Sequence, residues 1–207
     1  MSTRGPRTMV EAAPRAGSAA ADGLDAAVVA AARRGEPWAQ RRLIAALQDP
    51  VHRLVWRMLG TAGRDHVAQD LTQEALVRIV RALPGYVEGG AAKFSTWALT
   101  IASRTAIDEL RRRVLPTAPP QALAVLPQGD PMPDLALERA AIGDAIAAAI
   151  DELAPEIRAT FVLRAYHELE YHEIAEALDV DLGTVKSRLF RARAALQRRL
   201  ERLRRDD

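Results

Sequence analysis

The sequence predicts an all-α protein made of two small helical domains joined by an extended proline-rich linker. The chain has 207 residues, of which 49% are hydrophobic and 27% charged, a composition and length suited to two compact units. Aromatic residues make up only 4%, and the chain is rich in Ala, Leu, Arg and Glu, which lose little on entering a helix. Six prolines between residues 115 and 134 exclude a helix there, because proline lacks a backbone donor and biases its preceding residue toward extended conformations.

The proline-rich segment divides the chain. Residues 1–22 hold almost no large apolar side chain and cannot offset chain entropy by burial, so we expect a disordered N-terminal tail. The first helical domain then covers residues 23–114, the linker covers 115–134, and the second helical domain covers 135–207.

Apolar residues recur at helical spacing along the first domain. Helices are expected over 24–32, 38–59, 65–83 and 95–113. In the second of these, Pro50 predicts a kink or a local boundary, because proline removes a helical hydrogen bond. The third ends at Pro84-Gly85. The buried face of the fourth is predicted to consist of Leu99, Ile101, Ala102, Ala106, Ile107 and Leu110.

The same spacing predicts four helices in the second domain, over 135–153, 155–167, 171–178 and 182–203. One face of the first is formed by Ile142, Ile146, Ile150 and Leu153. Pro155 falls in the first turn of the second, where proline is tolerated. Only Asp179 to Asp181 join the last two helices. A short helix, a tight turn and a basic second helix predict a helix-turn-helix.

The charge is distributed unevenly, although it sums to only +2. Residues 134–181 carry 12 acidic and 3 basic side chains, whereas residues 182–205 carry 9 basic and 1 acidic. The basic end predicts a polyanionic partner such as DNA. A solvated basic helix is the alternative from charge alone, and the tight turn before it favours DNA binding.

Composition also argues against several chemistries. The chain has no cysteine, which excludes a disulfide, a thiolate nucleophile and a Cys-ligated metal. Its 4 histidines lack metal-ligand spacing, and no catalytic triad, phosphate loop or carboxylate dyad stands out, so we expect no metal, no cofactor and no enzymatic activity. No apolar run reaches the roughly 18 to 20 residues of a membrane span, and no signal peptide is evident. We expect a cytoplasmic protein without membrane insertion.

The basic helix offers groups suited to reading duplex DNA. Val185, Leu189 and Ala192 are expected to face inward and seat it. Residues near its start would enter the major groove, where donors meet phosphates and base edges. The candidate duplex-contacting residues are Thr184, Lys186, Ser187, Arg188, Phe190, Arg191 and Arg193.

Three motifs together resemble a known family. The stretch from Tyr171 to Leu196, which contains Val185-Lys-Ser-Arg-Leu-Phe-Arg-Ala-Arg193, resembles the C-terminal promoter-binding domain of extracytoplasmic-function (ECF) sigma factors of the sigma-70 family. Asp70-Leu-Thr-Gln-Glu-Ala75 resembles the helix by which these proteins dock on RNA polymerase. Residues 94–113 resemble the helix that opens and reads the −10 element. The motifs follow the family's order and imply a sigma-2-like first domain and a sigma-4-like second domain.

The resemblance implies an alternative sigma factor that directs promoter-specific transcription initiation. Its partners would be core RNA polymerase, through the β and β′ subunits, and promoter DNA with its −35 and −10 elements. An anti-sigma factor is a further candidate partner. The residues expected to bind core polymerase are Asp70, Gln73, Glu74 and Val77, whose i, i+3, i+4, i+7 spacing places them on one side of a helix.

Candidate −10 residues lie where a glycine-containing loop meets the fourth helix, and along that helix. Aromatic rings can stack on unpaired bases while cations neutralise phosphates. The set consists of Lys93, Phe94, Trp97, Arg104, Asp108, Arg111, Arg112 and Arg113. For Trp97, core packing is at least as good an interpretation as base contact.

Three positions depart from the family pattern. Ser103-Arg104 replaces a common Arg-Asn pair, which leaves the detailed −10 contacts open because a guanidinium and a carboxamide satisfy different base edges. Asp179 and Glu168 stand where glycine is usual. Aspartate tolerates left-handed backbone geometry, so we expect the turn at Asp179 to survive.

A conventional helix-turn-helix transcription regulator that does not bind core polymerase is the main alternative function. Such a protein would bind duplex DNA tightly by itself. A helical adaptor, or an enzyme whose ligand site the sequence does not reveal, is the second alternative.

Overall fold

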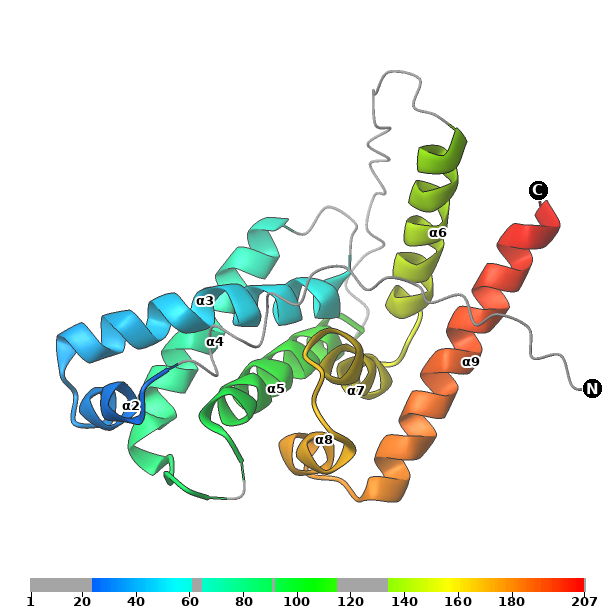
Figure 1. Cartoon of the computed structure of the whole chain (residues 1–207). Coiled ribbons are helices and arrows are strands. Elements are labelled where there is room, and N and C mark those ends of the chain that lie inside the picture. The colour runs from blue at the N-terminus through cyan, green and yellow to red at the C-terminus, as the bar shows by residue number, and fades with distance from the viewer. Residues whose placement is uncertain (1–23, 61–64, 91, 115–133, 207) are drawn as a thin grey trace, which may run out of the picture.

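The computed structural model describes residues 24–60, 65–90, 92–114 and 134–206. In these ranges all regular structure is helical, which confirms the predicted all-α class. The elements are α2 (Ala26–Arg33), α3 (Pro37–Leu59), α4 (Asp65–Ala82), the 3-10 turn η1 (Leu83–Gly85), α5 (Phe94–Val114), α6 (Asp134–Asp151), α7 (Pro155–Tyr166), α8 (Tyr171–Leu178) and α9 (Leu182–Asp206) (Figure 1). The predicted tail, and the predicted linker up to residue 133, lie outside the described residues.

Helix α3 is the centre of the first domain. It packs against α2, α4 and α5, and its residues Leu43, Leu47 and Leu54 are at most 1% exposed. Pro50 lies inside α3 and is buried, so the predicted local boundary is absent. The helix continues past Pro50 because packing on either side of it, through Leu47 and Val51, outweighs one lost hydrogen bond.

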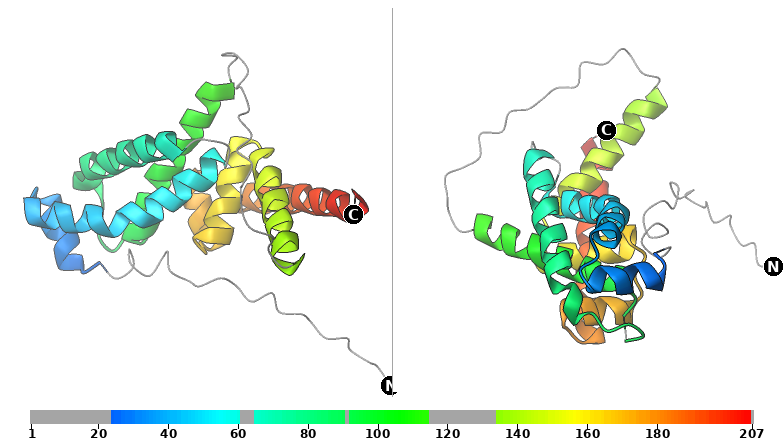
Figure 2. Two further views of the ribbon diagram at one scale, coloured as in Figure 1. Left: turned by 90° about the horizontal axis from the view of Figure 1, so that it is seen from above. Right: turned by 90° about the vertical axis from the view of Figure 1, so that its left-hand side faces the viewer.

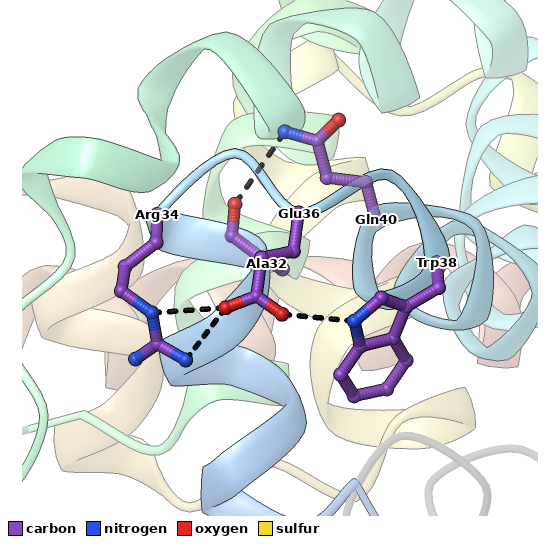
Figure 3. Close-up of polar contacts among 5 residues, drawn as sticks. All are labelled: Ala32, Arg34, Glu36, Trp38 and Gln40. Atoms are coloured by element: carbon purple, nitrogen blue, oxygen red, sulfur yellow. Dashed lines mark hydrogen bonds and ion pairs between the residues drawn. The ribbon is translucent and has the colours of Figure 1, made fainter.

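A polar cluster fixes the turn between α2 and α3 (Figure 3). The Glu36 carboxylate accepts hydrogen bonds from Arg34 at 2.8 and 3.0 Å and from the indole N–H of Trp38 at 2.8 Å. The hydrogen bond from Arg34, and then the one from Trp38, lowers the pKa of Glu36. The Gln40 side chain also donates to the Ala32 carbonyl at 3.4 Å. These contacts orient α2, which forms one wall of the pocket described below.

The second domain contains the predicted helix-turn-helix in α8 and α9. At the start of α8, the Glu173 carboxylate accepts a hydrogen bond from the backbone N–H of Glu170 at 2.7 Å. The turn after α8 places Asp179 at φ +54°, which confirms that aspartate can take the left-handed position there. Glu168 is also left-handed, with φ +57°, in the turn between α7 and α8.

Helix α6 packs along α9 at the far end of the second domain (Figure 1). Of its predicted apolar face, Ile150 and the following Leu153 are buried and Ile146 is half-buried. Ile142 is 38% exposed, so the expected face is covered only toward the end of α6.

The two domains share one hydrophobic core. Helix α7 packs against α3 and α5, and α8 packs against α5, so the second domain lies directly on the first (Figures 1 and 2). Ala159, Val162 and Leu163 of α7 are at most 1% exposed and join the same apolar cluster as the buried residues of α3. The sequence predicted two domains, and only the tertiary structure shows their contact.

Candidate nucleic-acid interface

The Asp181 carboxylate fixes the start of α9. Its Oδ1 accepts a hydrogen bond from the Thr184 backbone N–H at 2.8 Å, and its Oδ2 accepts one from the Thr184 hydroxyl at 2.7 Å. Hydrogen bonds from the side chain and then the backbone of Thr184 lower the pKa of Asp181. The Ser187 hydroxyl likewise donates to the Thr184 carbonyl at 3.0 Å. Both hydroxyl protons are therefore used by groups at the start of α9, which leaves oxygen lone pairs to meet a partner.

The outer face of α9 carries most of the predicted −35 residues. Val185, Leu189 and Ala192 are at most 2% exposed, which confirms the predicted inner face. The exposed residues are Lys186, Ser187, Phe190, Arg191 and Arg193. Phe190 is 74% exposed, so the surface combines cations with a large apolar ring.

Arg188 and Thr184 are half-buried, unlike the other predicted −35 residues. The positive charge of Arg188 is one of the smaller causes that lower the pKa of Glu156 on α7.

Three aromatic rings pack together where the loop after η1 enters α5. Tyr86 lies 5.2 Å from both Phe94 and Trp97, measured between ring centroids, and Phe94 lies 5.6 Å from Trp97. Phe94 is 9% exposed and Trp97 is half-buried. The core-packing interpretation of Trp97 therefore has direct support, although part of the ring remains open to solvent.

A pocket of about 310 Å³ opens beside these rings. Its lining residues are Leu24, Ala26, Val29, Tyr86, Glu88, Lys93, Phe94 and Ser95. This volume is at the lower end of the ~300 to 1,000 Å³ range of ligand sites, and its walls combine aromatic surface with a few polar groups. Burial, and then the charge of Glu88, raises the pKa of Tyr86, so its hydroxyl remains a donor at neutral pH.

Sequence reasoning missed Tyr86 and Glu88. The available signal was an aromatic residue directly after Pro84-Gly85, in the same glycine-containing loop that leads to Lys93. That signal alone did not indicate a pocket, because its opposite wall comes from α2.

The central part of α5 presents Arg104 and Asp108 to solvent. Ser103, the other member of the unusual pair, is 0% exposed and cannot reach DNA in this arrangement. The side chain of Arg113 lies outside the described residues.

The basic end of α5 is engaged by carboxylates. Arg112 pairs with Glu109 on the same helix at 2.7 Å. Arg111 reaches the second domain, where its Nε and Nη2 donate to Glu156 Oε1 at 2.9 and 2.5 Å. These predicted −10 residues are exposed, but their charges are partly neutralised.

The predicted polymerase-binding face of α4 is open to solvent. Its exposed residues are Asp70, Gln73, Glu74 and Val77. Val77 is 47% exposed, so an apolar side chain accompanies the polar ones. The Glu74 carboxylate accepts a hydrogen bond at 2.5 Å from Arg78, which also donates to the Thr105 hydroxyl of α5 at 3.3 Å.

The histidines are not grouped. In the part of the chain that the structure describes, no three potential metal ligands come together. His167, at the end of α7, is 3% exposed, and neither ring nitrogen has a hydrogen-bond partner among the described residues. Burial, followed by the positive charge of Arg53, lowers the pKa of His167 to about 4.

None of the described helices is both long and apolar enough to cross a bilayer.

Comparison with known proteins covers both domains. The Sigma-70 region 2 family matches residues 43–114, and the Sigma-70 region 4 family matches residues 143–196. The RNA polymerase sigma-H factor of Pseudomonas aeruginosa is 32% identical over 191 residues, which cover 88% of this chain and 96% of that protein. The chain belongs to the ECF group of the sigma-70 family. It is therefore an alternative sigma factor, a type of protein that directs transcription initiation.

Other ECF sigma factors are similar over different lengths. SigE of Mycolicibacterium smegmatis is 37% identical over 151 residues, covering 72% of this chain but only 56% of that protein. SigW of Bacillus subtilis is 29% identical over 177 residues, covering 81% of this chain and 92% of that protein. All candidate residues of α4, α5 and α9 fall within the two matched family regions.

Solved structures support the fold. CnrH, in complex with the cytosolic domain of CnrY, superposes with a TM-score of 0.60 at 22% identity, covering 88% of this sigma factor and 97% of that chain. RpoE of Bartonella quintana, in complex with the anti-sigma factor NepR, superposes with a TM-score of 0.58 at 19% identity, covering 78% and 96%.

Proposed function

We propose that this sigma factor binds core RNA polymerase through α4, reads the −35 duplex with α9, and captures −10 bases at the start of α5. The outer face of α9 carries this proposal. Its cations and an exposed ring project from a helix seated on buried Val185, Leu189 and Ala192. A rigid helix with such a face is the element that fits the major groove.

In the −35 step, Arg191 is the proposed base reader and Lys186 and Arg193 contact phosphates. Arginine can donate to two acceptors on guanine at once, and Phe190 can contact a thymine methyl group. Thr184 and Ser187 would accept hydrogen bonds from base amino groups, because their own protons already bind Asp181 and the Thr184 carbonyl.

In the −10 step, the pocket beside α5 takes an unpaired base. Tyr86 and Phe94 would supply aromatic surface, and Glu88 could accept a hydrogen bond from an exocyclic amino group. Lys93 and Arg104 are exposed and would hold the backbone phosphates on either side. The predicted contacts of Trp97, Asp108, Arg111, Arg112 and Arg113 remain part of this proposal.

In the polymerase step, Asp70, Gln73 and Glu74 lie on the same side of α4 as the exposed Val77, toward the N-terminal end of the helix. Polar side chains beside an exposed apolar one suit a coiled coil that presents basic and amide side chains. The proposed partner is core polymerase, through its β and β′ subunits.

The polymerase would perform the chemistry, so the sigma factor itself is not proposed to be an enzyme. Its proposed place of action is the cytoplasm, where it would meet RNA polymerase. An anti-sigma factor is a proposed further partner, since the structurally similar RpoE of Bartonella quintana was solved with one.

Run-off transcription with core polymerase over a genomic promoter library tests the function and returns both promoter elements. We expect specific transcripts only when the sigma factor and core are combined. Asp70→Asn with Glu74→Gln should weaken core binding, whereas Asp49→Asn, at an exposed carboxylate on α3, should not. Absence of promoter-specific transcripts, together with unchanged core affinity of the α4 variant, would contradict the proposal.

A conventional helix-turn-helix regulator remains the alternative function to test. It would bind selected promoter DNA equally tightly with and without core polymerase. The proposed function requires weak binding by the free sigma factor and strong binding by the complex with core.

A further inference from the structure

The contact between the two domains is organised by Arg158 of α7, a side chain that is 5% exposed. Its Nη1 donates to the Met58 carbonyl in the last turn of α3 at 2.7 Å. Its Nη2 donates to the carbonyls of Asp151 and Leu153 in its own domain. A buried guanidinium is tolerated only where acceptors are in place, so these bonds favour one docked arrangement of the domains.

Further polar contacts cross the same boundary. The Arg57 guanidinium of α3 lies 4.2 Å from the centroid of the Tyr166 ring of α7. The Thr96 hydroxyl of α5 donates to Glu173 of α8 at 3.4 Å. The docked state therefore combines a shared apolar core with polar pairs along both α3 and α5.

Glu156 lies where this boundary meets the proposed DNA surfaces. Its Oε1 accepts two hydrogen bonds from Arg111, a predicted −10 residue. Burial acts to raise the pKa of Glu156, but its own backbone N–H, the hydrogen bond from Arg111 and the charges of Arg111 and Arg188 outweigh burial and lower it. The ionised Glu156 carboxylate thus occupies a predicted −10 cation.

We propose that Glu156 is an internal competitor of DNA, which occupies Arg111 while the two domains are docked. A carboxylate satisfies a guanidinium much as a phosphate does, so the same donors cannot serve both fully. Full use of Arg111 by DNA then requires the ion pair between Arg111 and Glu156 to open, and core polymerase would favour the open form by holding the domains apart. This inference rests on the proposed function, because it assigns Arg111 to DNA.

The exposure of the pair sets the expected size of the effect. The Arg111 side chain is 61% exposed and that of Glu156 is 30% exposed, so solvent screens their attraction. Exposed ion pairs contribute at most about 1 kcal/mol, which corresponds to roughly a two- to five-fold change in affinity. Glu156 therefore weakens DNA binding by the free protein without abolishing it.

The test compares Glu156→Gln with Glu152→Gln in the full chain without polymerase. Glu152 is a matched control, because it is 66% exposed and lies 4.0 Å from Arg199 of its own domain. Each substitution removes one negative charge, so the nonspecific attraction of the protein to DNA rises equally in both variants.

The probe is a mixed-sequence DNA duplex, and its binding is measured by fluorescence anisotropy at low salt. We expect Glu156→Gln to bind roughly two- to five-fold more tightly than wild type and Glu152→Gln to change far less. Equal affinities of the two variants would overturn the inference.

A double variant identifies the released cation. Adding Arg111→Gln to Glu156→Gln should remove most of the gain in DNA affinity, and a gain that persists would exclude Arg111 as its source.

Urea unfolding checks that all variants fold. Transcription with core polymerase separates the two proposals: Glu156→Gln should match wild type there, because core already holds the open form. Failure of the wild-type protein to support transcription would contradict the proposed function. The anisotropy comparison tests separately whether Glu156 weakens DNA binding.

Discussion

Helices α9 and α5 are both proposed to contact promoter DNA, but they present their residues differently. On α9, Lys186, Phe190 and Arg191 project into solvent from a buried seat. On α5, Phe94 is buried in an aromatic cluster and Arg111 is paired with Glu156 of the other domain. The proposed −35 face is therefore open to solvent, whereas the proposed −10 face is partly occupied by the protein itself.

This difference fits the two forms of DNA. Base edges of a duplex are already displayed in the major groove, so an exposed rigid helix is sufficient to read them. A −10 base must leave the stack and be held elsewhere, which requires a pocket and costs a few kcal/mol of unstacking. In the proposal above, the pairing of Arg111 with Glu156 in the free protein would reduce such contacts with DNA at random sites.

The largest expected effect comes from Arg158, which joins the two domains. Arg158→Ala leaves the carbonyls of Met58, Asp151 and Leu153 without this donor and should lower the free energy of unfolding by about 3 kcal/mol. Urea unfolding measures the loss. Arg164→Ala removes a half-buried arginine whose hydrogen bonds to described residues stay inside the second domain, with Leu169 and Glu170, and should cost about 1 kcal/mol. Similar losses for both would mean that Arg158 does not couple the domains.

Acidification should weaken the docked fold through His167. Its pKa is lowered from 6.5 to about 4 in the folded protein, so the unfolded chain binds the proton more readily. The stabilising contribution of the neutral ring is complete above about pH 6.5 and is lost as pH falls toward 4, by on the order of 2 kcal/mol at about pH 5.

Urea unfolding across this pH range measures the loss, and His167→Gln should flatten it. His172→Gln is the control, because His172 is exposed and should leave the pH dependence unchanged. A profile for His167→Gln that matches wild type would exclude His167 as the titrating group.

Arg191→Ala tests the open face of α9. If Arg191 reads a base, the variant should lose about 1 to 3 kcal/mol of binding to the selected −35 sequence and little on a scrambled sequence. Binding of the polymerase complex to both sequences across a salt series separates these cases. An equal loss on both would reassign Arg191 to phosphate contact.

Lys93→Gln should have the smallest effect. This substitution tests the proposed phosphate contact of Lys93 beside the pocket. Losing one phosphate contact to a single strand should reduce the slope of log affinity against log salt by about 0.7, with little change in sequence preference. Lys93→Arg should retain the wild-type slope. An unchanged slope in Lys93→Gln would remove this residue from the proposed −10 surface.

Local sequence was enough to predict most elements of the fold. Helix α8 runs from Tyr171 to Leu178 as expected, because a short amphipathic segment ends at a residue suited to left-handed geometry. The inner face of α9 was predicted from the spacing of Val185, Leu189 and Ala192, which are all buried. Pro50 was misleading as a boundary, because its effect depends on the helices that pack around α3.

The candidate site was predicted only where its residues lie on one helix. Spacing placed the exposed face of α9, and spacing together with the family motif placed that of α4. The pocket requires α2 to meet the loop at Tyr86 and Glu88, and periodicity does not encode that approach. Arg111 and Glu156 are 45 residues apart in the chain, so neither motif indicated their pairing.

The sequence by itself determined the helical class, the two domains, the family resemblance and the faces of α4 and α9, because each follows from local propensity, spacing or a contiguous motif. The tertiary structure alone decided how the domains meet. Arg158 bonds to Met58 across 100 residues, and His167 and Glu156 become unusual only through what surrounds them. Burial and charge pairing depend on groups brought together by folding, so the degree to which each DNA surface is open could not be derived from the order of residues.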